Sequence, residues 1–188
     1  MTDAAADDAA PAWPPSDADV ALHLRHAHRV ALAAVAAGHH PFGAILVGPD
    51  GRTVVMEQRN VDVVNHAEST LCRRAYAELG LSDAARARCT LYSTVEPCAM
   101  CAGTQYWAGI GGLVYGITEH RLLQLTGASD ENPTMNLPCR TVFAAGQKAV
   151  RVVGPVPALE EEIAAPHLEF WTRAASHDAT GGEKEAAP

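Results

Sequence analysis

Apolar residues follow two patterns along the chain, helical spacing and short continuous runs, and the two patterns alternate. Continuous runs rich in Val, Ile, Leu and Tyr predict buried strands. Apolar residues three and four apart, with capping residues at the ends, predict helices. The predicted strands cover residues 42–48, 52–59, 89–95, 111–117 and 148–156, and the predicted helices cover residues 18–37, 66–80, 97–109, 119–127 and 157–175. Strands that alternate with helices indicate a layered α/β sandwich.

Residues with special backbone preferences mark where these elements begin and end. Ser16 can cap the first helix, and Gly38 ends it. A Pro-Asp-Gly turn joins the first two strands into a hairpin over residues 42–59. Pro97 occupies the first position of its predicted helix, where proline is favoured. Pro166 lies inside the last predicted helix and is a point at which that helix can break.

The chain has 188 residues, of which 48% are hydrophobic, and this is enough for one domain with its own core. We expect this domain over residues 17–176. The acidic arm at 1–16 and the tail at 177–188 are poor in apolar residues with helical or strand spacing. Because such segments cannot bury enough apolar surface to order themselves, we expect both to be disordered.

The net charge of −8 is concentrated at the two ends of the chain. Residues 1–19 contribute −5 and residues 160–188 contribute another −5, whereas residues 20–159 carry +2. Nucleic-acid-binding domains usually carry a clear basic patch. The nearly neutral body therefore makes nucleic acid an unexpected partner.

Composition also bears on where the protein acts. No apolar run reaches membrane-spanning length, and the acidic first residues lack the basic start of a secretory signal, so we expect neither a membrane span nor a leader. Five cysteines are an odd number for a disulfide framework, and a chain of this length does not need one. We therefore expect a cytoplasmic, reducing location.

Two short motifs carry the candidate chemistry. Cys98 and Cys101 follow Pro97 directly, and His66 and Glu68 occupy a second motif at the start of another predicted helix. Taken alone, the cysteine pair could be a disulfide, a redox pair, half of a structural zinc site or part of a catalytic one. On a helix the two sulfur atoms lie on one face, and the helix N-terminus favours the thiolate form that a metal needs.

His66 supplies a third metal ligand, and three protein ligands leave a tetrahedral zinc ion one open position for water. This count favours a catalytic zinc site over a structural one, which needs a fourth protein ligand. The redox-pair interpretation leaves His66 and Glu68 without a role. Three other cysteines, Cys72, Cys89 and Cys139, lack such spacing and are expected outside the site.

Glu68 has two interpretations. As a carboxylate close to the metal without binding it, Glu68 can carry a proton from the water to a ring nitrogen and to leaving ammonia. Alternatively, Glu68 is only a helix cap that reaches back to the backbone of Asn65. The complete pattern favours the catalytic role, because zinc lowers the pKa of bound water towards neutrality and leaves a proton to be moved.

The H-x-E and P-C-x-x-C motifs together resemble those of the cytidine/purine deaminase superfamily, the zinc-dependent nucleobase deaminases. The resemblance covers residues 41–116, including "PFGAILV", "RNVDVVNHAE" and "TLYSTVEPCAMCAGTQYWAGIGGLVYG", and is closest to guanine deaminases and tRNA adenosine deaminases. It implies a three-layer α/β/α sandwich with a mixed sheet of five strands. It also implies one zinc ion per chain and a homodimer or larger oligomer.

The resemblance also implies which residues meet the substrate. Phe42 and Ala44 correspond to the strand that lines the pocket, and Asn60 to an amide that hydrogen-bonds the base. Glu169 is a second candidate proton carrier, on a segment, residues 167–173, that packs over a neighbour's active site in guanine deaminases. Asp130 lies in a segment that matches the family less well and is a candidate for recognising a ring amine or a sugar hydroxyl. The full set of candidate substrate contacts is Phe42, Ala44, Asn60, Ala67, Trp107, Asp130 and Glu169.

The sequence thus predicts an enzyme that uses zinc and water to deaminate a small aminated heterocycle, with guanine as the first candidate. Phe42 favours a guanine-type pocket, because tRNA adenosine deaminases tend to carry a smaller aliphatic residue there. Three alternatives stay open: a nucleoside deaminase acting on guanosine, cytidine or adenosine, a tRNA adenosine deaminase, and a zinc-binding interaction module without catalysis. Intact Glu68 argues against the last of these.

Overall fold

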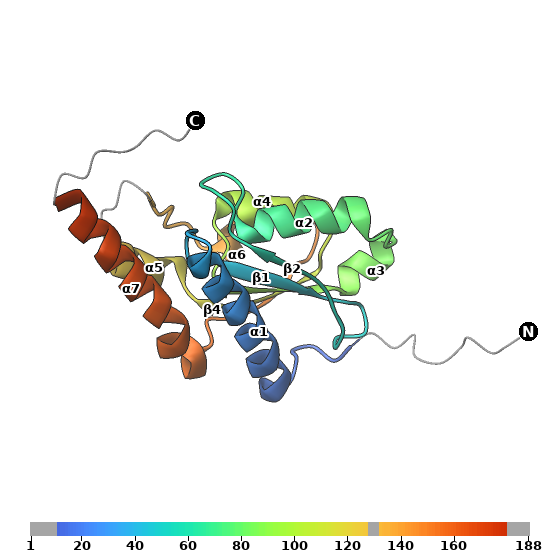
Figure 1. Cartoon of the computed structure of the whole chain (residues 1–188). Coiled ribbons are helices and arrows are strands. Elements are labelled where there is room, and N and C mark those ends of the chain that lie inside the picture. The colour runs from blue at the N-terminus through green and yellow to red at the C-terminus, as the bar shows by residue number, and fades with distance from the viewer. Residues whose placement is uncertain (1–10, 128–131, 180–188) are drawn as a thin grey trace, which may run out of the picture.

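The computed structural model describes residues 11–127 and 132–179, with side chains described as far as Thr172. Helices lie on both faces of one central sheet (Figure 1). In chain order the elements are α1 (Asp17–Ala36), β1 (Gly43–Val47), β2 (Val54–Arg59), α2 (Ala67–Glu78), α3 (Asp83–Arg88), β3 (Thr90–Val95), α4 (Ala99–Ala108), β4 (Gly112–Ile117), α5 (Glu119–Thr126), α6 (Cys139–Ala144), β5 (Arg151–Val153), a 3-10 turn (Pro157–Leu159) and α7 (Glu160–Ala179).

The sheet has five strands in the order β2-β1-β3-β4-β5. Strand β1 is antiparallel to both of its neighbours, whereas β3, β4 and β5 run parallel to one another. The sheet is therefore mixed, as predicted. Its three central strands are buried at every position, which explains why β1 and β4 read as continuous apolar runs in the sequence.

Alternate side chains of the central strands enter two separate cores. Ala44 and Leu46 of β1 point towards α2, α4 and α6, whereas Ile45 and Val47 point towards α1, α5 and α7. Figure 1 shows α2 and α4 next to one another on one side of the sheet and α1 and α7 on the other. This arrangement confirms the predicted three-layer α/β/α sandwich.

Several boundaries differ from those expected. The helices α3 and α6 are not among the predicted elements, because each has six residues and is too short to show helical spacing. Strand β5 is shorter than the predicted 148–156. Pro166 does not break α7, because buried residues on both sides of it, Ile163 and His167, hold the helix against the rest of the protein.

The two predicted disordered ends lie largely outside the described residues, which omit 1–10 and 180–188. Within the arm, Trp13 is half-buried, and the guanidinium of Arg151 stacks 4.5 Å from the centre of its ring. The domain boundaries at residues 17 and 176 stay a prediction. Across the described part of the chain, no helix is both long and apolar enough to cross a membrane.

Gly43, the first residue of β1, lets α1 pack directly on the strand backbone. A Cβ at this position would lie 2.5 Å from the backbone nitrogen of Ala31 and against the carbonyl of Ala27, both in α1. These are backbone atoms, so no side-chain rotation relieves the clash. The close approach fixes the helix against the end of the sheet at which the functional site lies.

We therefore expect Gly43→Ala to lower the free energy of unfolding by about 1–3 kcal/mol, the usual cost of overpacking a core. Urea denaturation of the zinc-loaded protein measures this change. Gly103→Ala is the matched control, because a Cβ at this position in α4 meets nothing within 4 Å. Alanine also favours a helix interior over glycine. Equal unfolding midpoints for the two variants would contradict the packing argument.

Candidate active site

The candidate active site lies at one edge of the sheet, where several chain segments begin or end together. Gly43, at the start of β1, pairs with Arg59, at the end of β2. Val95, at the end of β3, pairs with Ile117, at the end of β4. The carboxyl ends of parallel strands are a common location for ligand sites in α/β sheets. Here the reversed direction of β1 brings its amino end to the same edge.

Two helix N-termini carry the metal-binding side chains into this edge. His66 is the N-cap residue of α2, and Cys98 is the N-cap residue of α4. Cys101 lies in the first turn of α4 and is fully buried. The Nδ1 atom of His66 lies 3.7 Å from the sulfur of Cys98 and 3.6 Å from that of Cys101. The three donor atoms all lie within 4.8 Å of one another, close enough to hold one metal ion.

The imidazole of His66 is oriented by its other nitrogen. Nε2 donates a hydrogen bond of 3.1 Å to the backbone carbonyl of Val63. This hydrogen bond fixes the tautomer that leaves the Nδ1 lone pair for a metal. One imidazole nitrogen and two sulfur atoms form a donor set typical of zinc, and three donors leave one position open to water.

Hydrogen bonds within the cluster prepare the sulfur of Cys98 for ligation. Contacts with Cys101 and with His66 lower the pKa of the Cys98 thiol, whereas the same contact with Cys98 raises the pKa of the Cys101 thiol. The contact with Cys98 also raises the pKa of His66 to about 9. Protons and a metal ion therefore compete for Nδ1, and metal binding releases a proton. All five cysteines are free thiols, and Cys72, Cys89 and Cys139 are buried in the core.

Glu68 lies beside the three donors and is 4% exposed. Ser93 of β3 donates a hydrogen bond of 2.7 Å to one carboxylate oxygen. The other oxygen lies 3.5 Å from the sulfur of Cys101. The side chain is thus directed into the site and away from the Asn65 backbone, which disfavours the capping interpretation. Burial raises the pKa of Glu68, so this carboxyl can both accept and release a proton under mild conditions.

Sequence reasoning missed three polar residues around the site. Ser93 holds Glu68, and the sequence carries no signal that separates its hydroxyl from those of Thr90, Tyr92 and Thr94 in the same buried strand. Glu96 and Glu119 are buried at the ends of β3 and β4. Burial, followed by the charges of Cys98 and Glu68, raises the pKa of Glu119 to about 8. The signal for Glu96 was its position directly before Pro97 in the cysteine motif.

Four of the predicted substrate contacts lie at this edge of the sheet. Ala44 pairs with Ser93 in the sheet, and Ala67 is the first residue of α2. Asn60 is 2% exposed, and its backbone nitrogen donates a 3.0 Å hydrogen bond to the carbonyl of Phe42. This hydrogen bond joins the two backbones at the open end of the hairpin, and the side-chain amide of Asn60 lies 3.4 Å from the backbone carbonyl of Asp62.

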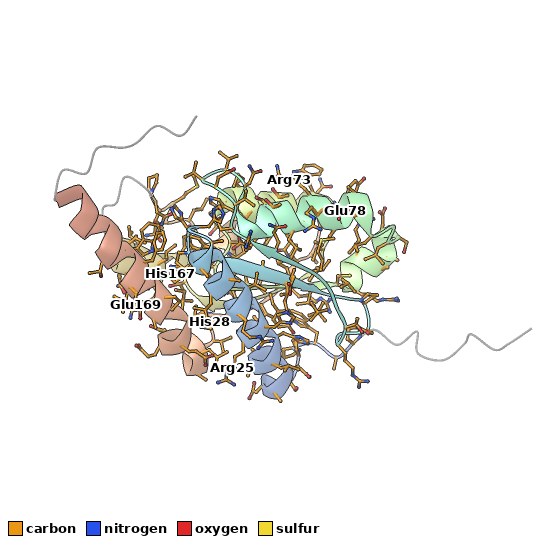
Figure 2. All side chains as sticks on the ribbon, viewed as in Figure 1. Arg25, His28, Arg73, Glu78, His167 and Glu169 are labelled. Atoms are coloured by element: carbon orange, nitrogen blue, oxygen red, sulfur yellow. The ribbon has the colours of Figure 1, made fainter. Side chains whose placement is uncertain are left out.

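Two of the remaining three candidates are exposed on helices. Trp107 is 76% exposed near the C-terminal end of α4, away from Cys98. Glu169 is exposed on α7, whereas His167 of the same helix is buried and packs edge-on against Phe42 at 5.1 Å (Figure 2). Asp130 lies outside the described residues.

One imidazole, two thiols and a buried, non-ligating carboxylate at two helix N-termini define a zinc-dependent hydrolase site. The family comparison makes the class specific. The chain matches the family model for the cytidine and deoxycytidylate deaminase zinc-binding region over residues 18–117, and it belongs to that family. The protein is therefore a zinc-dependent deaminase, as predicted from the two motifs.

Deaminases that are similar to this chain in sequence support the same assignment. A probable cytosine deaminase from Schizosaccharomyces pombe is 35% identical over 159 residues, which is 83% of this chain and 94% of that protein. A guanine deaminase from Bacillus subtilis is 41% identical over 87 residues, which is 43% of this chain and 51% of that protein. The solved guanine deaminase from Nitrosomonas europaea shares the fold, with a TM-score of 0.60 and 23% identity over 80% of this chain and 83% of that chain.

We expect Glu68→Gln to retain one zinc ion per chain and to lose about 10²–10⁴ in turnover, the usual effect of removing a general acid–base. His66→Ala is the paired control, because it removes a metal donor and should lose zinc as well as activity. Elemental analysis and ammonia release measure the two properties separately. Normal turnover by Glu68→Gln would make Glu68 a structural residue, and loss of its zinc would make Glu68 a ligand.

Proposed function

We propose that the protein hydrolytically deaminates a free nucleobase, with guanine as the first candidate. The observation that carries this proposal is the closeness of Phe42 and Asn60, joined by a backbone hydrogen bond, at the same edge of the sheet as the three metal donors. An aromatic ring can stack on the face of a flat heterocycle, and a buried amide can hydrogen-bond to its edge. Together they suit a small, planar, polar ring better than an extended substrate.

In the proposed reaction, the oxygen of water bonds to the ring carbon that carries the amine, and the bond from this carbon to the exocyclic nitrogen breaks. Glu68 takes one proton from the water and delivers it to the ring nitrogen. It then takes the proton of the new hydroxyl group and delivers it to the departing amine, which leaves as ammonia while the carbon–oxygen double bond forms. His66, Cys98 and Cys101 would hold the zinc ion. Ser93 keeps the Glu68 carboxylate oriented through its 2.7 Å hydrogen bond.

Two further features favour a free base. Phe42 is backed by the ring of His167 on α7, so the side of the site next to β1 carries two packed rings. Residues 160–188 have a net charge of −5, which disfavours contact with a nucleic-acid backbone. The guanine deaminases among the relatives support guanine as the first substrate to test.

Cytosine is a second candidate, favoured by the relative from Schizosaccharomyces pombe. This probable cytosine deaminase is matched over 94% of its length, including regions beyond the two metal motifs. Relatives that are tRNA-specific adenosine deaminases, one 34% identical over 52% of this chain, keep tRNA as an outcome to test. We propose cytoplasmic action, where the five free thiols stay reduced.

We expect ammonia release from a free base to exceed that from cytidine, guanosine, adenosine and a tRNA anticodon stem-loop when kcat/KM values are compared. Guanine should give the largest value, and cytosine serves as the direct competitor. Glu68→Gln run on the same panel gives the background. A tRNA or nucleoside value well above that of every base would overturn the free-base proposal, and a larger value for cytosine would replace guanine.

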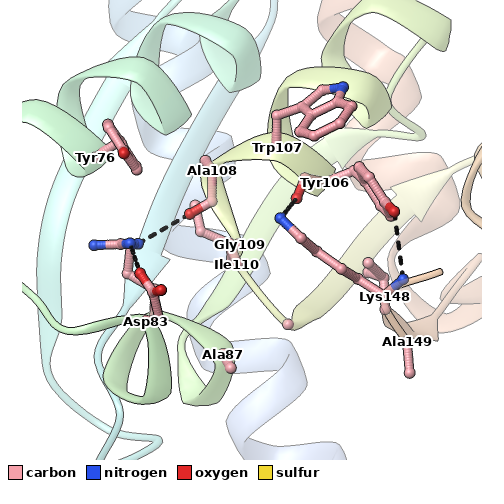
Figure 3. A pocket seen from close by; sticks show the side chains of 13 residues that line it. Tyr76, Asp83, Ala87, Tyr106, Trp107, Ala108, Gly109, Ile110, Lys148 and Ala149 are labelled. Carbon is pink, nitrogen blue, oxygen red and sulfur yellow. Dashed lines mark hydrogen bonds and ion pairs between the residues drawn. The ribbon is translucent and has the colours of Figure 1, made fainter. Parts of the chain in front are cut away.

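We also propose that the protein forms a homodimer through the outer face of α2 and α4. Trp107 and Tyr76 project from these neighbouring helices with 76% and 59% exposure. A cavity of about 470 Å³ opens beside them and also includes Lys148, whose ammonium lies 5.5 Å from the Trp107 ring centre (Figure 3). A two-fold interface brings the same patch together twice, so a protruding ring next to a cavity suits a self-complementary contact.

Trp107→Ala should weaken this dimer by about 30-fold or more in Kd, because a buried tryptophan is a common hot spot. Sedimentation equilibrium over a range of protein concentrations measures the change. Leu22→Ala is the control, since Leu22 is a 61% exposed apolar residue on α1, in the opposite layer. A wild-type protein that stays monomeric, or equal Kd values for the two variants, would rule out this interface.

A further inference from the structure

Glu96 is a buried carboxylate that the proposed chemistry does not use. It lies two residues before Cys98 and is 5% exposed. Its backbone N–H donates a 2.8 Å hydrogen bond to the carbonyl of Ile117, which extends the contact between β3 and β4 beyond their last paired residues. Burying a charged group in this way is costly unless it is hydrogen-bonded.

Both carboxylate oxygens of Glu96 accept backbone hydrogen bonds from separate helices. One oxygen accepts from the N–H of Glu119 at 3.3 Å, and the other accepts from the N–H of Cys139 at 2.9 Å. Glu119 is the first residue of α5, and Cys139 is the first residue of α6. One side chain from the β3–α4 connection therefore holds the first turns of two helices that are distant in sequence.

The helix α6 depends on this contact more than α5 does. Its N-cap residue is Pro138, whose side chain has no hydrogen-bond acceptor, so Glu96 supplies the acceptor from another part of the chain. The N-cap of α5 is Thr118, whose hydroxyl already accepts from the N–H of Arg121. Because first-turn N–H groups lack partners within their own helix, a carboxylate is an effective cap for both.

We propose that Glu96 is a positioning residue that fixes the first turns of α5 and α6 relative to Cys98 and thereby sets one wall of the substrate pocket. The Glu119 side chain supports this arrangement, because it is buried and interacts electrostatically with Cys98, Glu68 and His66. The positioning itself follows from the two hydrogen bonds. Only its effect on substrate binding rests on the proposed function.

Glu96→Gln is the most direct test. The amide keeps the shape of the side chain but offers one acceptor oxygen and turns an NH₂ group towards the other N–H, so one of the two helix contacts is lost. We expect zinc content and kcat to stay near wild type, whereas KM for the best base rises about tenfold or more. Hydrogen exchange should become faster at the backbone amides of Glu119 or Cys139.

Two further variants keep the test informative. Glu96→Asp retains the charge but is one methylene shorter, so its carboxylate cannot reach both helices. We expect the same rise in KM and the same faster exchange, and this variant carries the test if Glu96→Gln does not fold. Ser82→Ala is the matched control, because the hydroxyl of Ser82 caps α3 by accepting from Ala85. It should lower stability through loss of a cap, without changing KM or exchange at α5 and α6.

Hydrogen exchange is measured without substrate, so its result stands even if no free base is turned over. Unchanged exchange at residues 119 and 139 in both Glu96 variants would overturn the positioning role. Zinc loss in both variants would overturn it as well, and would assign Glu96 to support of the metal site. Faster exchange combined with an unchanged KM would retain the helix contacts but refute the effect on the pocket.

Discussion

The meeting of two helix N-termini at one edge of the sheet is the constraint on which the rest of the site depends. His66 and Cys98 occupy N-cap positions, and neither makes a capping hydrogen bond with its own helix through its side chain. The side chains are thus available to a metal ion, while the first-turn N–H groups provide a positive potential that favours thiolates. The side-by-side packing of α2 and α4 (Figure 1) then sets how far apart the donors lie.

Three buried carboxyl groups surround this edge, and each is stabilised differently. Glu68 accepts a hydrogen bond from the hydroxyl of Ser93, and Glu96 accepts hydrogen bonds from two backbone N–H groups. Burial, and then the neighbouring Cys98 and Glu68 charges, raise the pKa of Glu119 to about 8, so this group favours the neutral form at pH 7. A divalent cation between the donors would offset the remaining negative charge. Backbone N–H groups, protonation of a carboxyl group and a bound metal ion would together offset the negative charge of the site.

Much of the fold was readable from the sequence because β1 and β4 are buried at every position and leave clear apolar runs, and because β3, also buried, is rich in residues that favour strands. The metal donors were readable because Cys98 and Cys101 are three residues apart on one helix. Contacts between residues far apart in the sequence were not readable. Ser93 and Glu68 are 25 positions apart, and Cys139 and Glu96 are 43 positions apart. The short helices α3 and α6 lack enough residues to show a period, and Trp107 carries no signal of which way it faces.

The reversed direction of β1 separates two tasks within one sheet. Phe42 and Asn60 belong to the open end of a hairpin, whereas the metal donors belong to the first turns of α2 and α4, which pack against one another. Replacing Phe42 or Asn60 therefore removes none of the three metal donors. A scaffold of this kind can acquire a new substrate by small changes in one hairpin while its reaction chemistry is inherited unchanged.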